Sequence, residues 1–167
     1  MPVRNPKEVF IMLLSDARNN TERSVKMYRE MAKIAENPDV QEALTARAFI
    51  AEQNMDALDQ CFEMIDEEPV KITGRLQEIF MEDFKKELAD IQSPAAKHLY
   101  ILAKATHLAH LRMAEYAMLV ISADITGHYG VGVILETTLA DKMALLERDR
   151  RIVRHIMEGK ITERLIA

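Results

Sequence analysis

The 167-residue chain contains no tryptophan, a single cysteine, five glycines and five prolines. Few glycines and prolines leave few helix breakers, and strand-forming residues are sparse, so the composition favours helices over sheets. The one cysteine, Cys61, excludes a disulfide within one chain and is typical of a reducing compartment. The chain lacks an apolar run as long as a membrane span, and its opening residues lack a signal-peptide core. We therefore expect a cytoplasmic protein without a membrane partner.

What the chain does contain is alanine, leucine, methionine, glutamate and lysine, the residues that favour helices. Hydrophobic residues make up 49% of the chain and charged residues 29%, the balance of a globular protein. The formal net charge of −5 argues against nucleic acid as a partner, because a phosphate backbone attracts basic surfaces. At this length we expect a single domain over residues 1–167.

Capping signals divide the chain into five predicted helices. Asn5, Asn37 and Ser93 each precede a proline, and this pair is typical of a helix start. Gly127 is a candidate for the residue that ends the fourth helix, and Thr73 for the cap of the third. Four long helices and one shorter one, with tight connections, predict an all-α antiparallel four-helix bundle with one additional shorter helix. The expected ranges are 6–36, 39–67, 73–90, 95–125 and 129–158.

The fourth predicted helix is the most informative segment, because it carries two histidines among apolar residues. At about 100° per residue, His110 falls on the predicted core face and His107 on its flank. The same face includes Leu99, Ala103 and Ile121. A buried histidine needs a polar partner, so this helix predicts either a hydrogen-bonded core histidine or a metal ligand.

Long helix bundles can hold a di-iron centre, built from one Glu on each of two helices and a Glu-x-x-His on each of the others. The sequence contains neither Glu-x-x-His nor Glu-x-x-Glu. Its nearest motif, His107-x-x-His110, suits zinc or nickel better than a di-iron pair. The candidate metal ligands are therefore an irregular set, namely Glu22, Glu52, His110 and Asp141.

Two cations lie on the helices that a metal site would use. Arg112 and Lys142 would repel a metal ion, and either could instead form an interior ion pair with Glu22 or Glu52. The four candidate ligands would then be ordinary surface or ion-paired residues.

Other kinds of chemistry find little support. Cys61 lies in the apolar seam of the second helix and is predicted to be a core residue. The segment GHYGVG, residues 127–132, follows a helix rather than a strand, so it predicts a helix connection and not a phosphate-binding loop. The basic run at residues 148–154 is offset by Glu147 and Asp149 and is predicted to be a solvated face. The sequence supplies no catalytic residues.

Three segments of the chain match a known pattern, namely VFIMLLSD at residues 9–16, AHLRMAEY at 109–116 and LETTLADK at 135–142. On these segments the chain resembles the YciF/YciE-type bacterial stress-protein family of the ferritin-like superfamily. The resemblance covers nearly the whole chain, from about residue 8 to 158.

This resemblance implies a ferritin-like bundle, a homodimer and a role in stress without an established activity. It also implies acidic and histidine positions that recur in the family, from which this chain departs. The corresponding positions hold Thr21 or Glu22, Phe49 and Glu52, Ala109 and Arg112, and Asp141 and Lys142.

These observations lead to a first hypothesis of a stress-associated structural or interaction protein with a degenerate di-iron site and no cofactor. The alternative is a metal-binding protein or metal-dependent oxidase that holds iron or another divalent metal in an irregular core site. A third hypothesis is a carrier that binds a small ligand inside the bundle.

Overall fold

The computed structural model describes residues 3–71 and 74–166, with side chains described as far as Glu158 except those of residues 156 and 157. These residues form five helices and no strand, which confirms the all-α prediction. The helices are α1 (Pro6–Ile34), α2 (Pro38–Ile65), α3 (Leu76–Ala89), α4 (Pro94–Ile125) and α5 (Tyr129–Ile166).

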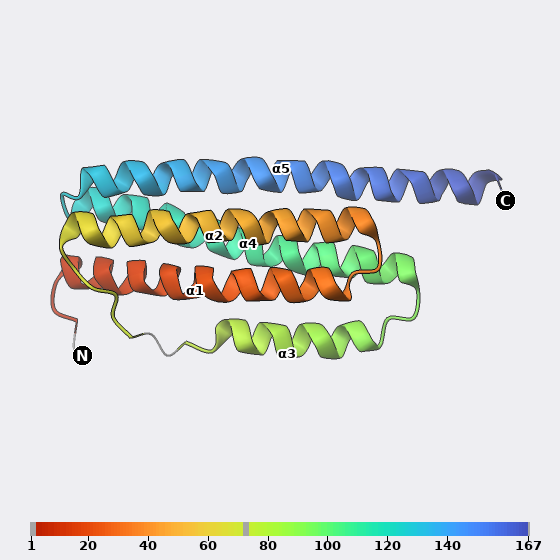
Figure 1. The fold of residues 1–167 in the computed structure, drawn as a ribbon, viewed down its shortest axis with the longest axis horizontal. Helices are drawn as coiled ribbons and strands as arrows, with labels where there is room; N and C mark the ends of the chain where they lie inside the picture. The colour runs from red at the N-terminus through yellow and green to blue at the C-terminus, as the bar shows by residue number, and fades with distance from the viewer. Residues whose placement is uncertain (1–2, 72–73, 167) are drawn as a thin grey trace.

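Four long helices lie side by side as a bundle, and neighbouring helices run antiparallel (Figure 1). Short turns join α1 to α2 and α4 to α5, so each pair is a helical hairpin. The connection from α2 to α4 is long, because these helices are diagonal neighbours that run in the same direction. It includes α3, which packs against α1 and α4 on the outside of the bundle.

The helix ends follow the capping residues seen in the sequence. The Asn5 side chain accepts a hydrogen bond from the Glu8 backbone N–H at 2.9 Å, and Asn37 accepts from Val40 at 3.1 Å. Gly127 has φ of +79°, a left-handed conformation that favours glycine at a helix end. The segment at residues 127–132 therefore joins two helices, as predicted, although its residues from Tyr129 onward already belong to α5. Thr73, the predicted cap of the third helix, lies outside the described residues.

Two hydrophobic clusters fill the bundle at its opposite halves. One centres on Tyr28, Leu44 and Phe84 and joins α3 to the long helices. The other centres on Phe10, Leu58 and Tyr116. The fully buried Cys61 belongs to the second cluster, as predicted, and burial raises the pKa of its thiol to about 12.

The predicted orientation of α4 is wrong. His110 is exposed, as is His107, and its Nδ1 lies 2.9 Å from the Thr106 carbonyl oxygen on the same helix. The face that enters the bundle lies around the helix from the predicted one and includes Ile101, Leu102, Ala105, Leu108, Arg112, Tyr116, Leu119 and Ala123. Alanine, leucine and methionine occur on several sides of α4, so periodicity alone did not fix which side is buried.

Two apolar side chains of α3, Leu76 and Ile79, are 59% and 47% exposed. Two further predictions, on Asp149 and on the end of α5, differ from the structure. Asp149, expected on a solvated face, is 3% exposed. The backbone of α5 continues to Ile166, beyond the predicted end at residue 158.

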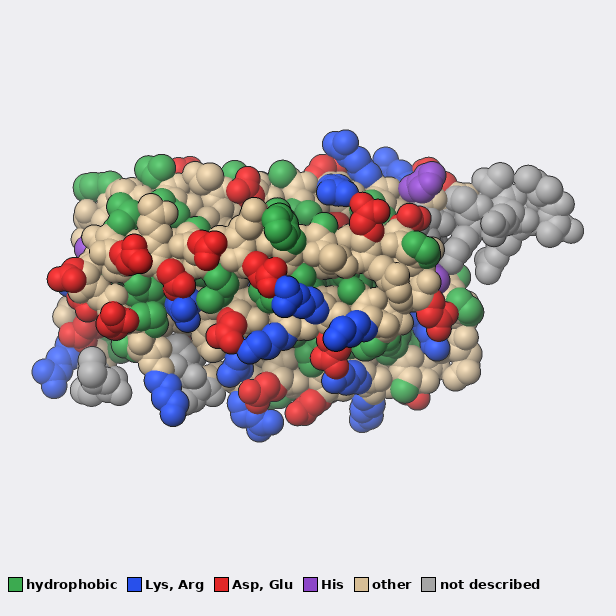
Figure 2. Space-filling model, in the orientation of Figure 1, with side chains coloured by type: hydrophobic (Ala, Val, Ile, Leu, Met, Phe, Trp, Pro, Cys, Tyr) green, Lys and Arg blue, Asp and Glu red, His purple; other side chains and the backbone are tan. Residues whose placement is uncertain are grey.

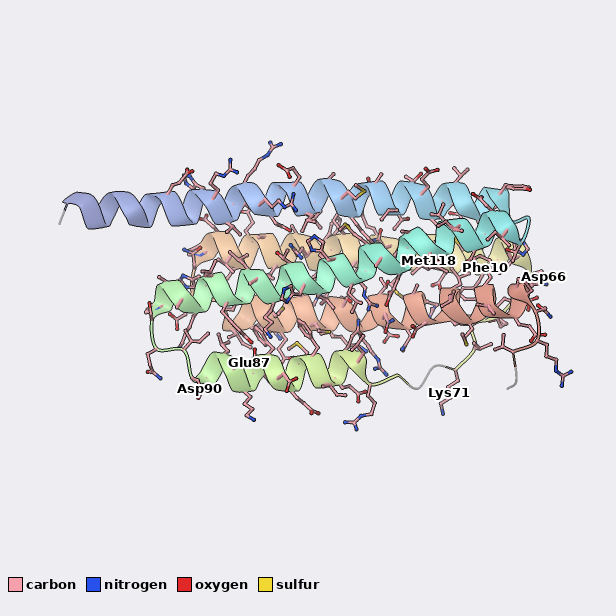
Figure 3. The ribbon with its side chains drawn as sticks, turned by 180° about the vertical axis from the view of Figure 1, so that it is seen from behind. Phe10, Asp66, Lys71, Glu87, Asp90 and Met118 are labelled. Atoms are coloured by element: carbon pink, nitrogen blue, oxygen red, sulfur yellow. The ribbon has the colours of Figure 1, made fainter. Side chains whose placement is uncertain are left out.

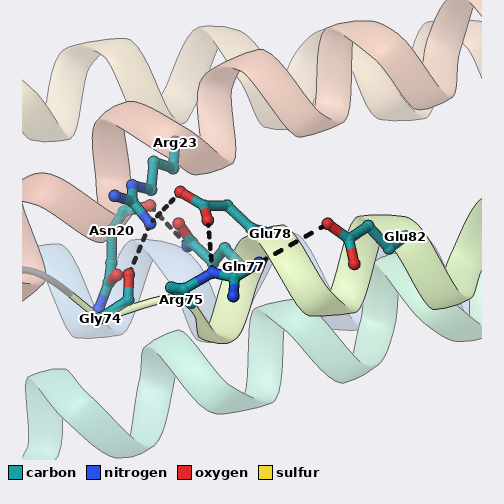
Figure 4. A network of polar contacts seen from close by, with 7 residues as sticks. All are labelled: Asn20, Arg23, Gly74, Arg75, Gln77, Glu78 and Glu82. Atoms are coloured by element: carbon teal, nitrogen blue, oxygen red, sulfur yellow. Dashed lines mark hydrogen bonds and ion pairs between the residues drawn. The ribbon is translucent and has the colours of Figure 1, made fainter.

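Polar contacts hold the start of α3 against α1 (Figure 4). The buried Gln77 side chain donates hydrogen bonds to the Asn20 carbonyl oxygen at 2.8 Å and to Ser24 Oγ at 3.1 Å. Arg23 donates to the Gly74 carbonyl oxygen at 2.8 Å and lies 3.4 Å from a Glu78 carboxylate oxygen. These bonds position α3 so that its apolar side chains reach the first cluster.

The burial of Phe84 predicts a large effect of truncation. Phe84 is 0% exposed and its ring stacks on Tyr100 at 5.8 Å between centroids. We expect Phe84→Ala to lower the free energy of unfolding by about 3–5 kcal/mol, because it leaves a cavity where α3 docks. Urea unfolding would measure this loss.

Phe49→Ala is the matched control, since Phe49 is 58% exposed and its truncation should change stability by less than about 0.5 kcal/mol. Equal losses would contradict the packing described for α3.

Candidate functional site: a charged cavity inside the bundle

A small cavity of about 30 Å³ lies between the four long helices. One water needs about 10–15 Å³, so the cavity has room for at least one water-sized species. Its lining is a mixture of apolar side chains and buried polar ones. The residues are Thr21, Ser24 and Tyr28 from α1, Arg47, Ile50, Ala51 and Asn54 from α2, Ala109 and Arg112 from α4, and Lys142, Leu145, Leu146 and Asp149 from α5.

An ion pair between Arg47 and Asp149 crosses from α2 to α5 at one side of the cavity. Both side chains are buried, with 3% and 4% exposed. Arg47 also donates to the Ala105 carbonyl oxygen of α4 at 2.6 Å, and its guanidinium carbon lies 5.6 Å from the Tyr28 ring centroid. Burial raises the pKa of the Asp149 carboxyl, while the nearby Arg47 opposes that rise. One cation thus contacts all the other long helices.

A second buried cation, Arg112, lies on α4 with only 3% of its surface exposed. Its Nη2 atom is 2.7 Å from Oε1 of Glu115, one turn further along the helix. Its Nε and Nη1 atoms have no hydrogen-bond partner among the described residues. Burial raises the pKa of Glu115 to about 7, although Arg112 acts in the opposite direction.

Lys142 of α5 is the third cation of the lining. Its Nζ atom lies 4.6 Å from the centroid of the buried Tyr116 ring, a cation–π contact. Burial and, to a lesser extent, the neighbouring charge of Arg112 lower the pKa of Lys142 to about 8. Lys142 makes no ion pair with the described residues. The cavity therefore has three cations in its lining and one carboxylate, Asp149.

This donor set does not fit a di-iron centre. Two metal ions need several carboxylates and imidazoles, whereas the one carboxylate of the lining is already paired with Arg47. Among the described residues no three or more histidine, cysteine, aspartate or glutamate side chains are grouped so that they could hold a metal ion.

The four predicted ligands are not brought together by the fold. Glu22 pairs with Lys26 on the surface of α1 at 2.7 Å, and Glu52 pairs with Arg29. His110 and Asp141 are exposed. The prediction that Arg112 forms an ion pair is correct, but its predicted partner is wrong. Arg112 pairs with Glu115 rather than with Glu22 or Glu52.

Sequence reasoning missed Arg47, Asn54 and Asp149 as members of the site. Arg47 and Asn54 lie within the buried stripe of α2, next to Ala43, Ala48 and Ala51 in the helical register. A polar residue inside an apolar stripe was the available signal for both. Asp149 gave no such signal, because it lies within a run of alternating charges.

Comparison with known families places this arrangement in context. Residues 5–163 match the model of a family described as a domain of unknown function, DUF892. The chain belongs to the DUF892 family. No curated protein sequence matches it.

Three solved structures are similar to this DUF892 chain in fold. The Escherichia coli stress protein YciF has a TM-score of 0.86 at 18% identity, over 93% of this chain and 99% of its own. YcfI from Rhodopseudomonas palustris, provisionally described as a structural protein, has a TM-score of 0.83 at 20% identity, over 89% and 94%. A protein from Xanthomonas campestris pv. campestris has a TM-score of 0.67 at 21% identity, over 93% and 99%. The predicted YciF-type resemblance is thereby confirmed at the level of family and fold.

None of the helices, within the described residues, is long and apolar enough to cross a membrane. The prediction of no membrane-spanning segment agrees with this finding.

The buried ion pair predicts an asymmetric response to mutation. Asp149→Asn leaves the Arg47 charge buried without its counter-ion, so we expect a loss of about 3–5 kcal/mol in the free energy of unfolding. Chemical denaturation would measure it. Asp59→Asn is the matched control, because Asp59 pairs with Arg18 but its side chain is 46% exposed, and the loss should stay below about 1 kcal/mol.

Replacing both partners tests the origin of that loss. In the double variant Arg47→Met, Asp149→Leu no charge remains unpaired, so stability should return to within a few kcal/mol of the native protein or exceed it. A double variant as unstable as Asp149→Asn alone would show that the loss has another cause.

Proposed function

We propose that this DUF892 protein is a ferritin-like, stress-associated structural or interaction protein of the bacterial cytoplasm, in which buried ion pairs replace a metal centre. The order of connections supports the ferritin-like assignment, since α2 and α4 are joined by one long crossover, as in ferritin-like bundles. The fully buried thiol of Cys61 agrees with a reducing compartment.

The observation that carries the proposal is the charge of the cavity lining. Arg47, Arg112 and Lys142 are cations from three of the four long helices, and each faces the space where facing helices of a di-iron bundle would present carboxylates. Cations so close together would repel a divalent metal, whereas the pair Arg47–Asp149 links α2 to α5 without one. The cross-linking role of a metal centre is thus taken by side chains.

Metal content and iron oxidation test the proposal against the metal-dependent alternative. We expect protein purified without chelator to contain less than stoichiometric iron, manganese or zinc, and to oxidise Fe(II) in air no faster than buffer. Added metal should leave the unfolding temperature unchanged, because a ligand of the folded state alone would raise it. Stoichiometric metal that disappears in Glu52→Ala would overturn the proposal and favour an oxidase with an irregular site. Glu42→Ala is the control, because Glu42 is an exposed carboxylate of the same helix.

We also propose that the protein is a homodimer that pairs through the outer face of α4. An uncharged stripe follows this face at helical spacing: Leu111, Ala114, Met118, Ile121 and Ile125. Met118, labelled on α4 in Figure 3, is 55% exposed, and Ile121 and Ile125 are 50% and 72% exposed. The opposite face of the molecule, over α1, α2 and α3, instead carries interspersed acidic and basic side chains (Figure 2). Contiguous exposed apolar residues mark interaction surfaces, and a self-complementary helix face suits a twofold dimer.

A charge within this α4 stripe should separate the dimer. We expect Ile121→Glu to sediment as a monomer at micromolar concentration, where the native protein sediments as a dimer, because the interface would then bury an unpaired carboxylate. Ile79→Glu is the matched control, since Ile79 is 47% exposed on α3 and its replacement should leave the dimer intact. A native protein that is monomeric under these conditions would contradict the proposed dimer.

A further inference from the structure

The cavity inside the bundle has more hydrogen-bond donors than the protein itself uses. Asn54 is 6% exposed and its Nδ2 atom has no hydrogen-bond partner among the described residues. The same holds for Nε and Nη1 of Arg112. Leaving a buried donor without an acceptor costs about 1–3 kcal/mol, and more when the donor is charged. These donors come from two helices and line the same small space.

The positive and negative charges around the cavity do not balance. Three cations face the cavity, and Asp149 neutralises Arg47. Glu115 is paired with Arg112 but does not line the cavity, and burial raises the pKa of this carboxyl to about 7, so it neutralises Arg112 incompletely at neutral pH. Asp16 also acts on Arg112 through its charge, from outside the lining. Lys142 forms no ion pair in the described residues, and the carboxylates whose charges act on it, Glu115 and Asp141, lie outside the lining. At neutral pH this space therefore has an excess of positive charge.

We propose that the cavity binds a small monovalent anion of about the size of chloride, contacted by Arg112, Lys142 and Nδ2 of Asn54. An anion accepts hydrogen bonds from unpartnered donors and compensates the excess charge at the same time, whereas a water molecule does only the first. The site differs from the metal site of the alternative hypothesis in both the sign of its ligand and the residues that hold it.

The size of the cavity restricts the anion. A volume of about 30 Å³ admits a few water-sized species, which suits a small anion such as a halide and excludes a nucleotide. The remaining lining consists of side chains such as Ile50, Leu145 and Leu146, which limit access of water to the charges.

Halide binding can be measured directly on the full-length protein as purified. Crystals soaked in sodium bromide should show an anomalous bromide peak inside the cavity, in contact with Arg112 and Asn54. In solution the unfolding temperature should rise more with sodium chloride than with sodium gluconate at the same ionic strength, because only a ligand that enters the cavity stabilises the folded state specifically. Bromide on the surface alone, with water in the cavity, would overturn the proposal, as would equal stabilisation by both salts.

A matched pair of lysine variants assigns the effect to the site. Lys142→Met keeps the length of the side chain and removes its charge, so halide affinity should fall at least about tenfold, a factor that corresponds to roughly 1.4 kcal/mol. Lys26→Met is the control, because the Lys26 side chain is 72% exposed on α1, and it should leave halide affinity unchanged. Unchanged affinity in Lys142→Met would overturn the assigned role of Lys142.

A second variant keeps the test decisive if Lys142→Met does not fold. Asn54→Ala removes a donor without adding charge or bulk, and the chloride-dependent rise in unfolding temperature should shrink in this variant. A rise as large as in the native protein would overturn the assigned role of Asn54. Neither result depends on metal content, so a failure of this proposal is distinguishable from a failure of the proposed metal-free function.

Discussion

The burial of cationic side chains between four helices is the constraint on which the interior of this bundle depends. An isolated charge is costly to remove from water, so each buried cation requires either a counter-ion or a dense set of acceptors. Arg47 meets this requirement with Asp149 and the Ala105 carbonyl oxygen, and thereby contacts α2, α4 and α5 together. Arg112 meets it less completely, through Glu115 on its own helix. The alignment of the long helices must keep these pairs in register.

The two hydrophobic clusters lie on either side of this charged centre. One joins α3 to the bundle through Phe84, and the other packs around Phe10 and Tyr116 near the turn between α4 and α5. Apolar packing supplies most of the stability of such a bundle, because its strength grows with the area removed from water. The ion pairs fix how the helices are aligned along their axes, because a shift of one helix by a single turn would separate Arg47 from Asp149. Whether that specificity exceeds its energetic cost is what the paired substitutions measure.

The outer face of α4 connects the fold to the proposed assembly. One apolar stripe of α4 is buried against the other helices of the bundle. A second, uncharged stripe of α4 faces away from the bundle. Ile121 belongs both to this second stripe and to the core face predicted from sequence, so exposed apolar residues contributed to the wrong orientation given to α4. Apolar residues indicate burial without saying against which surface. A partner molecule would reconcile the two observations.

Local rules determined a large part of this structure. Asn5, Asn37, Ser93 and Gly127 mark helix ends because their side chains or backbone satisfy terminal groups nearby in sequence, so the number of helices and most of their bounds followed from the sequence, whereas the end of α5 did not. The family resemblance also followed from sequence alone. The content of the cavity did not, because Arg47 and Asp149 are about a hundred residues apart and only the packing of α2 against α5 makes them partners. Which face of α4 enters the bundle was likewise decided by tertiary packing, since its two apolar stripes are equivalent until the neighbouring helices cover one of them.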